Sequence, residues 1–556
     1  MNNSPSKKRF VWLPVIIAVA VCAGIYAGNF YTRISLSNRN FSSLSEQNKI
    51  DNLINIIDRH YVDSVNPTDI IEKVMPKIMK ELDPHSIYIK ASEFQKINEP
   101  LEGSFSGIGI QFNMAIDTVT VVSVIPGGPS DKVGLLAGDR IVTINDTTYV
   151  GKDVVMDDIS TRLRGPKGTV VKVGVKRATS KDLLPFEITR GDIPLNSLDA
   201  SFMIDDQSGY IKISRFGRTT YTEFMNALAQ LRNDGASNYI IDLRGNSGGY
   251  MDEAINMVNE FLPKDRLIVY TEGKASPRNE AISNGTGAFQ TNPIVVLMDE
   301  WSGSASEIFA GAIQDNDRGT IIGVRSYGKG LVQQQIPFAD GSAIRLTIAR
   351  YYTPSGRSIQ REYKLGESEE YELDYISRLE HGELLSQDSI KQNDSLRYET
   401  YNGRTVYGGG GITPDIFVPR DTTNITTYYL QVMNTGVLYR FAFEYADKNR
   451  ETLKQYADCG SLLEYLQSQP LLEEFVNYAQ SKGIKRRPVY IQISKQLISE
   501  ALYAYIIRNT LEENDFYKVL SKSDKTILKA QEILRDGKSY PEAPVRQENK
   551  ETGTEK

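Results

Sequence analysis

The chain has 556 residues, which is enough for several domains of about 150 residues, each with a core of its own. Its composition is that of a folded protein, with 40% hydrophobic and 24% charged residues. A net charge of −6 argues against a dedicated nucleic-acid binder, which is normally basic. Cys22 and Cys459 lie far apart in the sequence and imply no disulfide framework.

The first thirty residues combine a basic flank with an apolar run. Residues 1–9 form a tail that ends in Lys7, Lys8 and Arg9, and residues 10–28 are almost entirely apolar. The run is near the lower length limit of a membrane-spanning helix and is long for a signal h-region, although a signal peptide cleaved after Ala27 is the alternative. We expect an uncleaved signal anchor that crosses the inner membrane once. The basic flank then stays cytoplasmic and the rest of the chain lies on the periplasmic side.

The region 29–102 is predicted to be helical. From Gln47 to about Leu82, apolar residues such as Ile50, Leu53 and Ile54 recur at three- and four-residue steps, the spacing of one helix face. The turn at residues 82–85, Leu-Asp-Pro-His, ends this pattern.

Residues 103–191 are predicted to form a β-rich module. Val119–Val124 and Val170–Lys176 are typical of strands, and a glycine–proline turn and a short helical stretch lie between them. Together with Gly107-Ile108-Gly109-Ile110, this order resembles a PDZ domain. The resemblance implies that these four residues supply the carboxylate-binding loop and the strand on which an extended peptide adds. A β-barrel without a ligand is the alternative.

Residues 192–420 show strand–loop–helix repeats, which predict a largely parallel sheet. Tyr239–Leu243, Ile294–Met298 and Gly319–Val324 are the predicted strands, and the helix after the second is expected to be amphipathic. Residues 361–406 are polar, with little periodicity, and are expected to be an insertion or a flexible loop.

The end of the chain is predicted to be helical and then irregular. Residues 421–536 contain several amphipathic stretches and form the expected helical C-terminal domain. Residues 537–556 are charged and contain proline, and are expected to be disordered.

A cluster of serines stands at the expected start of a helix, in Trp301-Ser302-Gly303-Ser304-Ala305-Ser306. A nucleophilic serine needs a base. His60 and His85 precede the α/β region that carries the cluster and His381 lies in the polar stretch 361–406, so we expect none of them in that role. Lys329 follows the next predicted strand and lies between two glycines. Burial would lower its pKa from about 10.4 towards neutrality and make it a usable base; a surface lysine in a glycine turn is the alternative.

Five ordered blocks, together with the PDZ-like module, resemble the carboxyl-terminal processing proteases, which are tail-specific Ser/Lys peptidases of family S41. The blocks are residues 82–86, 242–249, 302–333, 352–360 and 411–415, and the resemblance spans about residues 45–420. It implies a multidomain α/β fold, in which a crotonase/ClpP-like protease core carries an inserted PDZ domain. An N-terminal transmembrane helix would precede this core and a helical C-terminal extension would follow it. No cofactor or metal is implied.

The resemblance also implies roles for individual residues. Ser304 is the nucleophile, Lys329 is its general base, and Gln333 orients the lysine. The backbone N–H groups of Ala305 and Gly248 form the oxyanion hole, with Gly249 as the alternative to Gly248. The other two serines of the cluster are expected to serve in helix capping and packing.

The implied activity is that of a membrane-anchored serine endopeptidase that cleaves protein substrates near apolar C-termini held by the PDZ domain. A non-catalytic PDZ scaffold is one alternative, and the presence of both Ser304 and Lys329 argues against it. A crotonase-like acyl-CoA enzyme is another, but the lysine block and the PDZ domain would have no role there. A second copy of the chain or an adaptor protein is a candidate partner of the C-terminal helices, and no nucleic-acid partner is expected.

Overall fold

The computed structural model describes residues 13–42, 49–114, 118–151, 155–177 and 180–541. The chain divides into two units, residues 1–79 and 80–556. The first unit contains helices α1 (Leu13–Ser42), α2 (Lys49–His60) and nearly all of α3 (Pro67–Lys80). Within the described ranges, no helix combines the length and apolar character that a membrane crossing requires. The expected span at 10–28 begins outside those ranges and stays a prediction.

The second unit includes a β-rich domain, which the chain enters through β2 (Ser104–Gly107) and leaves through β9 (Gly191–Pro194). These strands pair antiparallel, with the first and last residues of the domain opposite each other. The domain has a core of its own and an antiparallel sheet in the order β3-β4-β5-β7-β8, with β6 beside β5. Its elements are β3 (Ile110–Asn113), β4 (Val119–Val124), α5 (Pro129–Lys132), β5 (Arg140–Ile144), β6 (Thr147–Thr148), α6 (Met156–Leu163), β7 (Val170–Lys176) and β8 (Leu184–Thr189). The predicted strands at 119–124 and 170–176 are confirmed.

A six-stranded sheet in the order β10-β11-β12-β15-β16-β21 forms the centre of the α/β region. β11 to β21 run parallel and β10 is antiparallel. The strands are β10 (Leu198–Met203), β11 (Ser208–Ile213), β12 (Asn238–Asp242), β15 (Ile294–Met298), β16 (Thr320–Gly323) and β21 (Ile416–Phe417). Both faces are covered, so β15 and β16 are buried along their whole length, which accounts for their apolar sequences.

Helices cover the two faces of this sheet. One face packs on α7 (Thr220–Asn233), α8 (Met251–Asn259) and α9 (Ala305–Asp315), and the other on α19 (Lys525–Arg535) near the end of the chain. The expectation for α9 is wrong, because all eleven of its residues are buried rather than one face only. On the side of α9 that faces away from the central sheet, the core includes residues of a second sheet, so α9 has no solvent-facing side.

The second sheet has the order β1-β18-β13-β14, with β17 beside β18. Its strands are β1 (Ile87–Ile89), β13 (Leu267–Glu272), β14 (Asn279–Ile282), β17 (Leu331–Pro337) and β18 (Ala343–Tyr352). Ahead of the β-rich domain, α4 (Ala91–Glu102) follows β1 and ends at Gly103, which adopts a left-handed φ of 77°.

The segment 361–406, expected to be an insertion or a flexible loop, is ordered, so the flexible loop is wrong and the insertion stays a prediction. The segment contains α10 (Ser368–Glu380), the short helices η3 (Gln387–Ser389) and η4 (Asp394–Leu396), and the hairpin β19 (Arg397–Glu399) and β20 (Thr405–Tyr407). Two buried side chains of α10, Tyr371 and Arg378, hold it in place, and Arg378 donates to the carbonyls of Arg325 and Ser326. Because such polar bonds, and not an apolar stripe, fix the segment, its sequence lacks helical periodicity.

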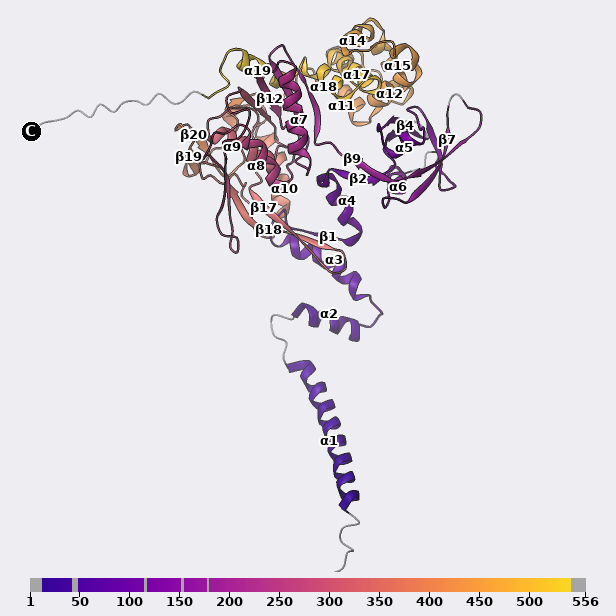
Figure 1. Cartoon of the computed structure of the whole chain (residues 1–556), viewed down its shortest axis with the longest axis vertical. Helices are drawn as coiled ribbons and strands as arrows, with labels where there is room; N and C mark the ends of the chain where they lie inside the picture. The colour runs from indigo at the N-terminus through magenta and orange to yellow at the C-terminus, as the bar shows by residue number, and fades with distance from the viewer. Residues whose placement is uncertain (1–12, 43–48, 115–117, 152–154, 178–179, 542–556) are drawn as a thin grey trace, which may run out of the picture. The chain divides into compact units, whose positions relative to one another are not determined.

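The C-terminal region is helical, as predicted, and its helices up to Ser521 form a bundle with its own core (Figure 1). They are α11 (Thr427–Asn434), α12 (Val437–Lys448), α13 (Arg450–Leu453), α14 (Cys459–Ser468), α15 (Leu471–Ser481), α16 (Pro488–Ile493), α17 (Lys495–Thr510) and α18 (Glu513–Ser521). The predicted domain of 421–536 is too long, because α19 packs on the central sheet. The expected disorder from 537 is wrong for the first residues after α19, since Tyr540 donates to the carbonyl of Thr291 and Thr320 donates to that of Ser539. The rest of that prediction, from 542, lies outside the described residues.

Candidate active site

Three loops that are far apart in sequence meet at one edge of the central sheet. They follow β12, β15 and β16, which run parallel, so their carboxyl ends share an edge. Backbone hydrogen bonds join the loops: Gly303 N–H donates to the carbonyl of Asn246 at 3.0 Å, and Tyr327 N–H donates to that of Ser302 at 3.0 Å. The glycine, serine and lysine motifs of the sequence are thereby brought together.

Ser304 differs from the two serines beside it. Ser302 and Ser306 are buried, and their hydroxyls donate to the carbonyls of Leu243 and Asn246 at 2.8 and 2.9 Å. Ser304 immediately precedes α9 at φ 55° and ψ −113°, a strained conformation for a residue with a side chain, and it lines a cavity. Of the three serines, it is the one placed to meet a substrate.

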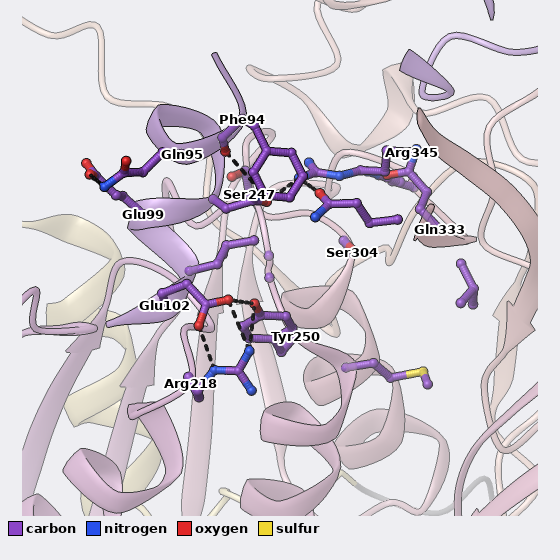
Figure 2. Close-up of a pocket in the computed structure, with 18 of the residues that line it drawn as sticks. Phe94, Gln95, Glu99, Glu102, Arg218, Ser247, Tyr250, Ser304, Gln333 and Arg345 are labelled. Carbon is purple, nitrogen blue, oxygen red and sulfur yellow. Dashed lines mark hydrogen bonds and ion pairs between the residues drawn. The ribbon is translucent and has the colours of Figure 1, made fainter. Parts of the chain in front are cut away.

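The cavity has a volume of about 1080 Å³, and Lys329 and Gln333 also lie in its wall. Figure 2 shows Ser304 and Gln333 among the residues that line it. Helix α4 contributes Phe94, Glu99 and Glu102 to the same wall. Among the described residues, no group of three or more histidine, cysteine, aspartate or glutamate side chains is arranged to hold a metal ion.

Lys329 lies in the cavity wall with its ammonium group tied to Gln333. Its Nζ donates to Gln333 Oε1 at 3.1 Å, and Gln333 Nε2 donates in turn to the carbonyl of His85. Burial lowers the pKa of Lys329 below its usual value, and the nearby positive charge of Arg345 lowers it further. No hydrogen bond joins the side chains of Ser304 and Lys329, both of which lie in the described part; such contacts often form only when substrate binds.

Glu307 connects the serine loop with the lysine loop. One carboxylate oxygen accepts the N–H groups of Ser304 and Lys329 at 2.8 and 2.9 Å. The other accepts the N–H of Gly328 at 2.7 Å and the hydroxyl of Ser326 at 2.5 Å. The side chain is completely buried, and this burial raises its pKa to about 7. The sequence interpretation omitted this residue, although a serine followed three positions later by glutamate is the signature of a capping box.

His85 lies next to the site, although it precedes the α/β region that carries the serine cluster. Its Nε2 is 2.9 Å from the hydroxyl of Tyr371, and its carbonyl holds Gln333. Burial is the main cause that lowers the pKa of His85 to about 4, and the charge of Lys329 adds to it. His85 therefore supports Gln333 through its backbone. Tyr371, in the segment expected to be a loop, gave no signal in the sequence.

The two glycines proposed for the oxyanion hole have different surroundings. The N–H of Gly248 donates to Asn246 Oδ1 at 2.9 Å. A Cβ on Gly248 would lie 2.7 Å from that of Ser304, and one on Gly249 would lie 2.1 Å from the carbonyl oxygen of Phe216. Both positions therefore require glycine, and both have positive φ. Ala305 is the first residue of α9, so its N–H has no partner within the helix.

The residues proposed to bind a peptide lie at the edge of the β-rich domain. β3, which begins at Ile110, pairs with β4 and with no second strand of the described ranges, so it is an edge strand of its sheet. Gly107 belongs to β2, Ile108 is buried, and Gly109 turns the chain with a φ of 75°. An edge strand leaves one row of backbone groups open for an added strand, but the peptide-binding role of these four residues stays a prediction.

Three parts of the chain match known families. Residues 207–366 match peptidase family S41, residues 106–188 match the PDZ domain, and residues 428–512 match a family of unknown function. The first match contains the glycine, serine and lysine loops described above.

Individual relatives give the same assignment. The chain is 33% identical to the carboxy-terminal processing protease CtpB of Bacillus subtilis over 317 residues, which are 56% of this chain and 65% of the relative. It is 35% identical to the carboxy-terminal-processing protease of Bartonella bacilliformis over 305 residues, which are 54% of this chain and 69% of the relative. The fold and the site thus define a serine-type peptidase of family S41 with a PDZ domain. Within that family, the chain belongs to the carboxyl-terminal processing proteases.

Solved structures are also similar. The photosystem II D1 C-terminal processing protease matches 68% of this chain and 94% of its own, with 24% identity and a TM-score of 0.34. The PDZ domain of a Vibrio cholerae carboxy-terminal protease, solved with a peptide, matches 16% of this chain and 99% of its own, with 31% identity and a TM-score of 0.15. At these TM-scores the similarity adds nothing to the assignment.

Proposed function

We propose that this chain is an endopeptidase that cleaves proteins near their C-termini, with Ser304 as nucleophile and Lys329 as general base. One observation carries the proposal: a strained serine at the start of a helix shares a cavity with a lysine whose pKa is lowered. A neutral lysine can accept the hydroxyl proton, which a lysine with an ordinary pKa near 10.4 rarely does at neutral pH.

In this mechanism, Lys329 takes the proton of Ser304 as the hydroxyl oxygen attacks the scissile carbonyl carbon. Gln333 orients the lysine through the hydrogen bond to its ammonium group. The oxygen of the tetrahedral intermediate gains negative charge and accepts the N–H of Ala305 and one N–H of the glycine pair 248–249. Gly248 can serve only after it releases Asn246, so Gly249 stays the alternative donor. Lys329 then returns its proton to the leaving amine, and water hydrolyses the acyl-enzyme in a second step.

The PDZ domain is proposed to hold the apolar tail of the substrate on β3, while the preceding residues enter the cavity. The same chain segments connect the two sites: β2 leads into the PDZ domain directly after α4, which lines the cavity. Arg164 at the end of α6 forms an ion pair with Glu99 of α4 at 2.7 Å. This ion pair links the PDZ domain, where the substrate tail is proposed to bind, to the wall of the catalytic cavity.

The experiment compares the chain lacking residues 1–31 with its Ser304→Ala and Lys329→Ala variants. Each is incubated with an unstructured protein that ends in apolar residues, and the fragments are identified by mass spectrometry. We expect cleavage near the C-terminus by the parent and a loss of at least about a thousandfold in both variants. Equal cleavage by all three would refute the Ser/Lys mechanism. Tail binding without cleavage by any of them would favour the scaffold.

Membrane attachment and periplasmic location are a separate proposal that rests on the basic flank and the apolar run at 10–28. Fractionation of cells that express the full chain or the chain lacking residues 1–31 tests it, because only the full chain should remain with the membranes after washing with alkaline carbonate. Pairing of the C-terminal helices with a second copy of the chain or with an adaptor protein is likewise a proposal. Light scattering of the purified chain gives its molar mass and so tests for the second copy.

A further inference from the structure

The charges in the wall of the catalytic cavity are not balanced. The carboxylates in the wall are each ion-paired, as Glu99–Arg164 at 2.7 Å, Glu102–Arg218 at 2.9 Å, and Asp192–Lys167. The cations in the wall are Arg218, Lys329 and Arg345, and of these only Arg218 has a carboxylate partner among the described residues. Among the described residues, Arg345 therefore lies in this wall without an acidic partner in contact, and so does Lys329 whenever it carries a proton.

Arg345 is held in place by neutral groups. It lies on β18, opposite Gln335 of β17, and its Nη2 donates to Gln335 Oε1 at 3.2 Å and to Asn98 Oδ1 at 3.1 Å. The side chain is half-buried, and Figure 2 shows it beside Gln333 in the same part of the cavity as Ser304. Burial lowers the pKa of Arg345, as expected for a cation that has lost water without gaining an anion.

A guanidinium in this position is suited to a carboxylate. It has five N–H donors in a planar fork. The two contacts just described both come from Nη2, so the N–H groups of Nε and Nη1 remain for a ligand. A charge-assisted hydrogen bond from one of them to a carboxylate is short and about twice as strong as a neutral one. Lys329 does not compete for the same group, because it must be neutral to act as a base.

We propose that Arg345 binds a carboxylate of the substrate inside the catalytic cavity, close to the peptide bond that Ser304 attacks. This inference rests on the proposed function, since it adds a recognition site to the same cavity. The carboxylate comes either from an aspartate or glutamate side chain near the scissile bond or from the terminal carboxylate of a short tail. The chemistry is the same for both sources, and the peptides used in the test distinguish them.

The test uses four versions of one quenched-fluorescent peptide. Glutamate or glutamine stands next to the scissile bond, and the C-terminus is either a free acid or an amide. For each pair, the ratio of kcat/KM for the carboxylate version to that for the amide version is measured. With the parent enzyme we expect a ratio of about 10 to 100 for one pair, the effect of a charge-assisted hydrogen bond in a partly buried site.

The same ratios are then measured for Arg345→Gln, Arg345→Lys and the control Arg350→Gln. Arg350 lies on the same strand but is exposed and outside the cavity wall, so its variant should keep the ratio of the parent. Arg345→Gln should reduce the ratio to about 1, and Arg345→Lys should keep part of it. A preference for the free C-terminus that persists in Arg345→Gln belongs to the PDZ domain and refutes Arg345 as the site of the terminal carboxylate. Melting curves show whether each variant is folded.

The outcomes separate this proposal from the proposed function. Equal ratios for the parent and Arg345→Gln would overturn the carboxylate site while leaving the peptidase intact. If the parent cleaves no peptide, the proposed function fails, but the site is still tested by binding. Fluorescence anisotropy then compares the four peptides on Ser304→Ala with and without Arg345→Gln. A preference of about tenfold or more that depends on Arg345 supports the site, and its absence refutes it.

Discussion

Replacing Glu307 with glutamine is expected to lower activity far more than stability. The carboxylate accepts two hydrogen bonds on each oxygen, from the lysine loop and from Ser304. The amide has one oxygen, so its NH2 group faces either two N–H donors or the N–H of Gly328 and the hydroxyl of Ser326, which can turn to accept. The variant therefore loses one or two hydrogen bonds to a charged acceptor, worth about 1.5 to 6 kcal/mol together.

The loss in stability is smaller than this because the charge itself is costly to bury. A rise of the Glu307 pKa from 4.5 to about 7 corresponds to about 3 kcal/mol at pH 8, at 1.4 kcal/mol per pKa unit. That cost is the net value for an ionised carboxylate that keeps its four hydrogen bonds, because these bonds already lower the pKa. Glutamine carries no charge and relieves the cost, so the free energy of unfolding should fall by no more than about 3 kcal/mol. The two loops are no longer fixed to each other, and displacements of about 1 Å at a nucleophile or base reduce kcat/KM by about a hundredfold.

The assay measures kcat/KM with the peptides described above and the unfolding free energy by urea titration, both at pH 8. The matched control is Glu260→Gln, another buried glutamate, which accepts from Tyr221 and Ala288 and lies outside the cavity wall. It should lose stability but keep its activity. Full activity of Glu307→Gln, or equal loss of activity in both variants, would refute the reasoning.

Three further predictions follow from neighbouring groups. The pKa of Glu307 is raised in the folded chain, so proton uptake by this carboxylate stabilises the fold. This stabilisation is complete below about pH 4.5 and is lost as the pH rises through about 7. Glu307→Gln should therefore flatten a plot of the urea midpoint against pH over this range. His85 has a lowered pKa, so stability is lost as the pH falls from 6.5 through about 4, and His85→Gln should make this loss shallower; an unchanged slope would contradict it. Tyr371→Phe removes the hydroxyl bound to His85, so it should lower stability by about 1 kcal/mol and reduce kcat several-fold. The control is Tyr375→Phe on the same helix. The Tyr375 hydroxyl contacts Arg420, so this variant should leave kcat unchanged.

The elements that carry strong local signals were predictable from the sequence. β15, β4 and β7 have the predicted bounds because an apolar or alternating run bounded by turn residues defines a strand locally. The relation between Ser304 and Lys329 was predictable for a similar reason, since strand–loop–helix repeats place consecutive loops at one edge of a parallel sheet. The choice of Ser304 agrees with its conformation and with the buried hydroxyls of its neighbours.

What the sequence did not predict depends on contacts between distant segments. α9 contains enough small and polar residues to suggest a solvent-facing side, and only the second sheet accounts for its complete burial. His85 and Tyr371 are 286 positions apart, and no local pattern brings them together. α10 is held by buried polar bonds, such as those of Arg378, that leave no apolar periodicity. Glu307 had a local signal, the capping box, but its contacts with the lysine loop come only from the fold.

The most direct measurement of the Ser/Lys mechanism is the rate at which a fluorophosphonate labels the chain, measured from pH 6 to 10 and mapped by peptide mass spectrometry. The account predicts one adduct, on Ser304, and a labelling rate that rises with pH through a pKa below the usual 10.5 of lysine. Labelling should be lost in Lys329→Ala. An adduct on Ser302 or Ser306, or an unchanged rate and pH profile in Lys329→Ala, would contradict it.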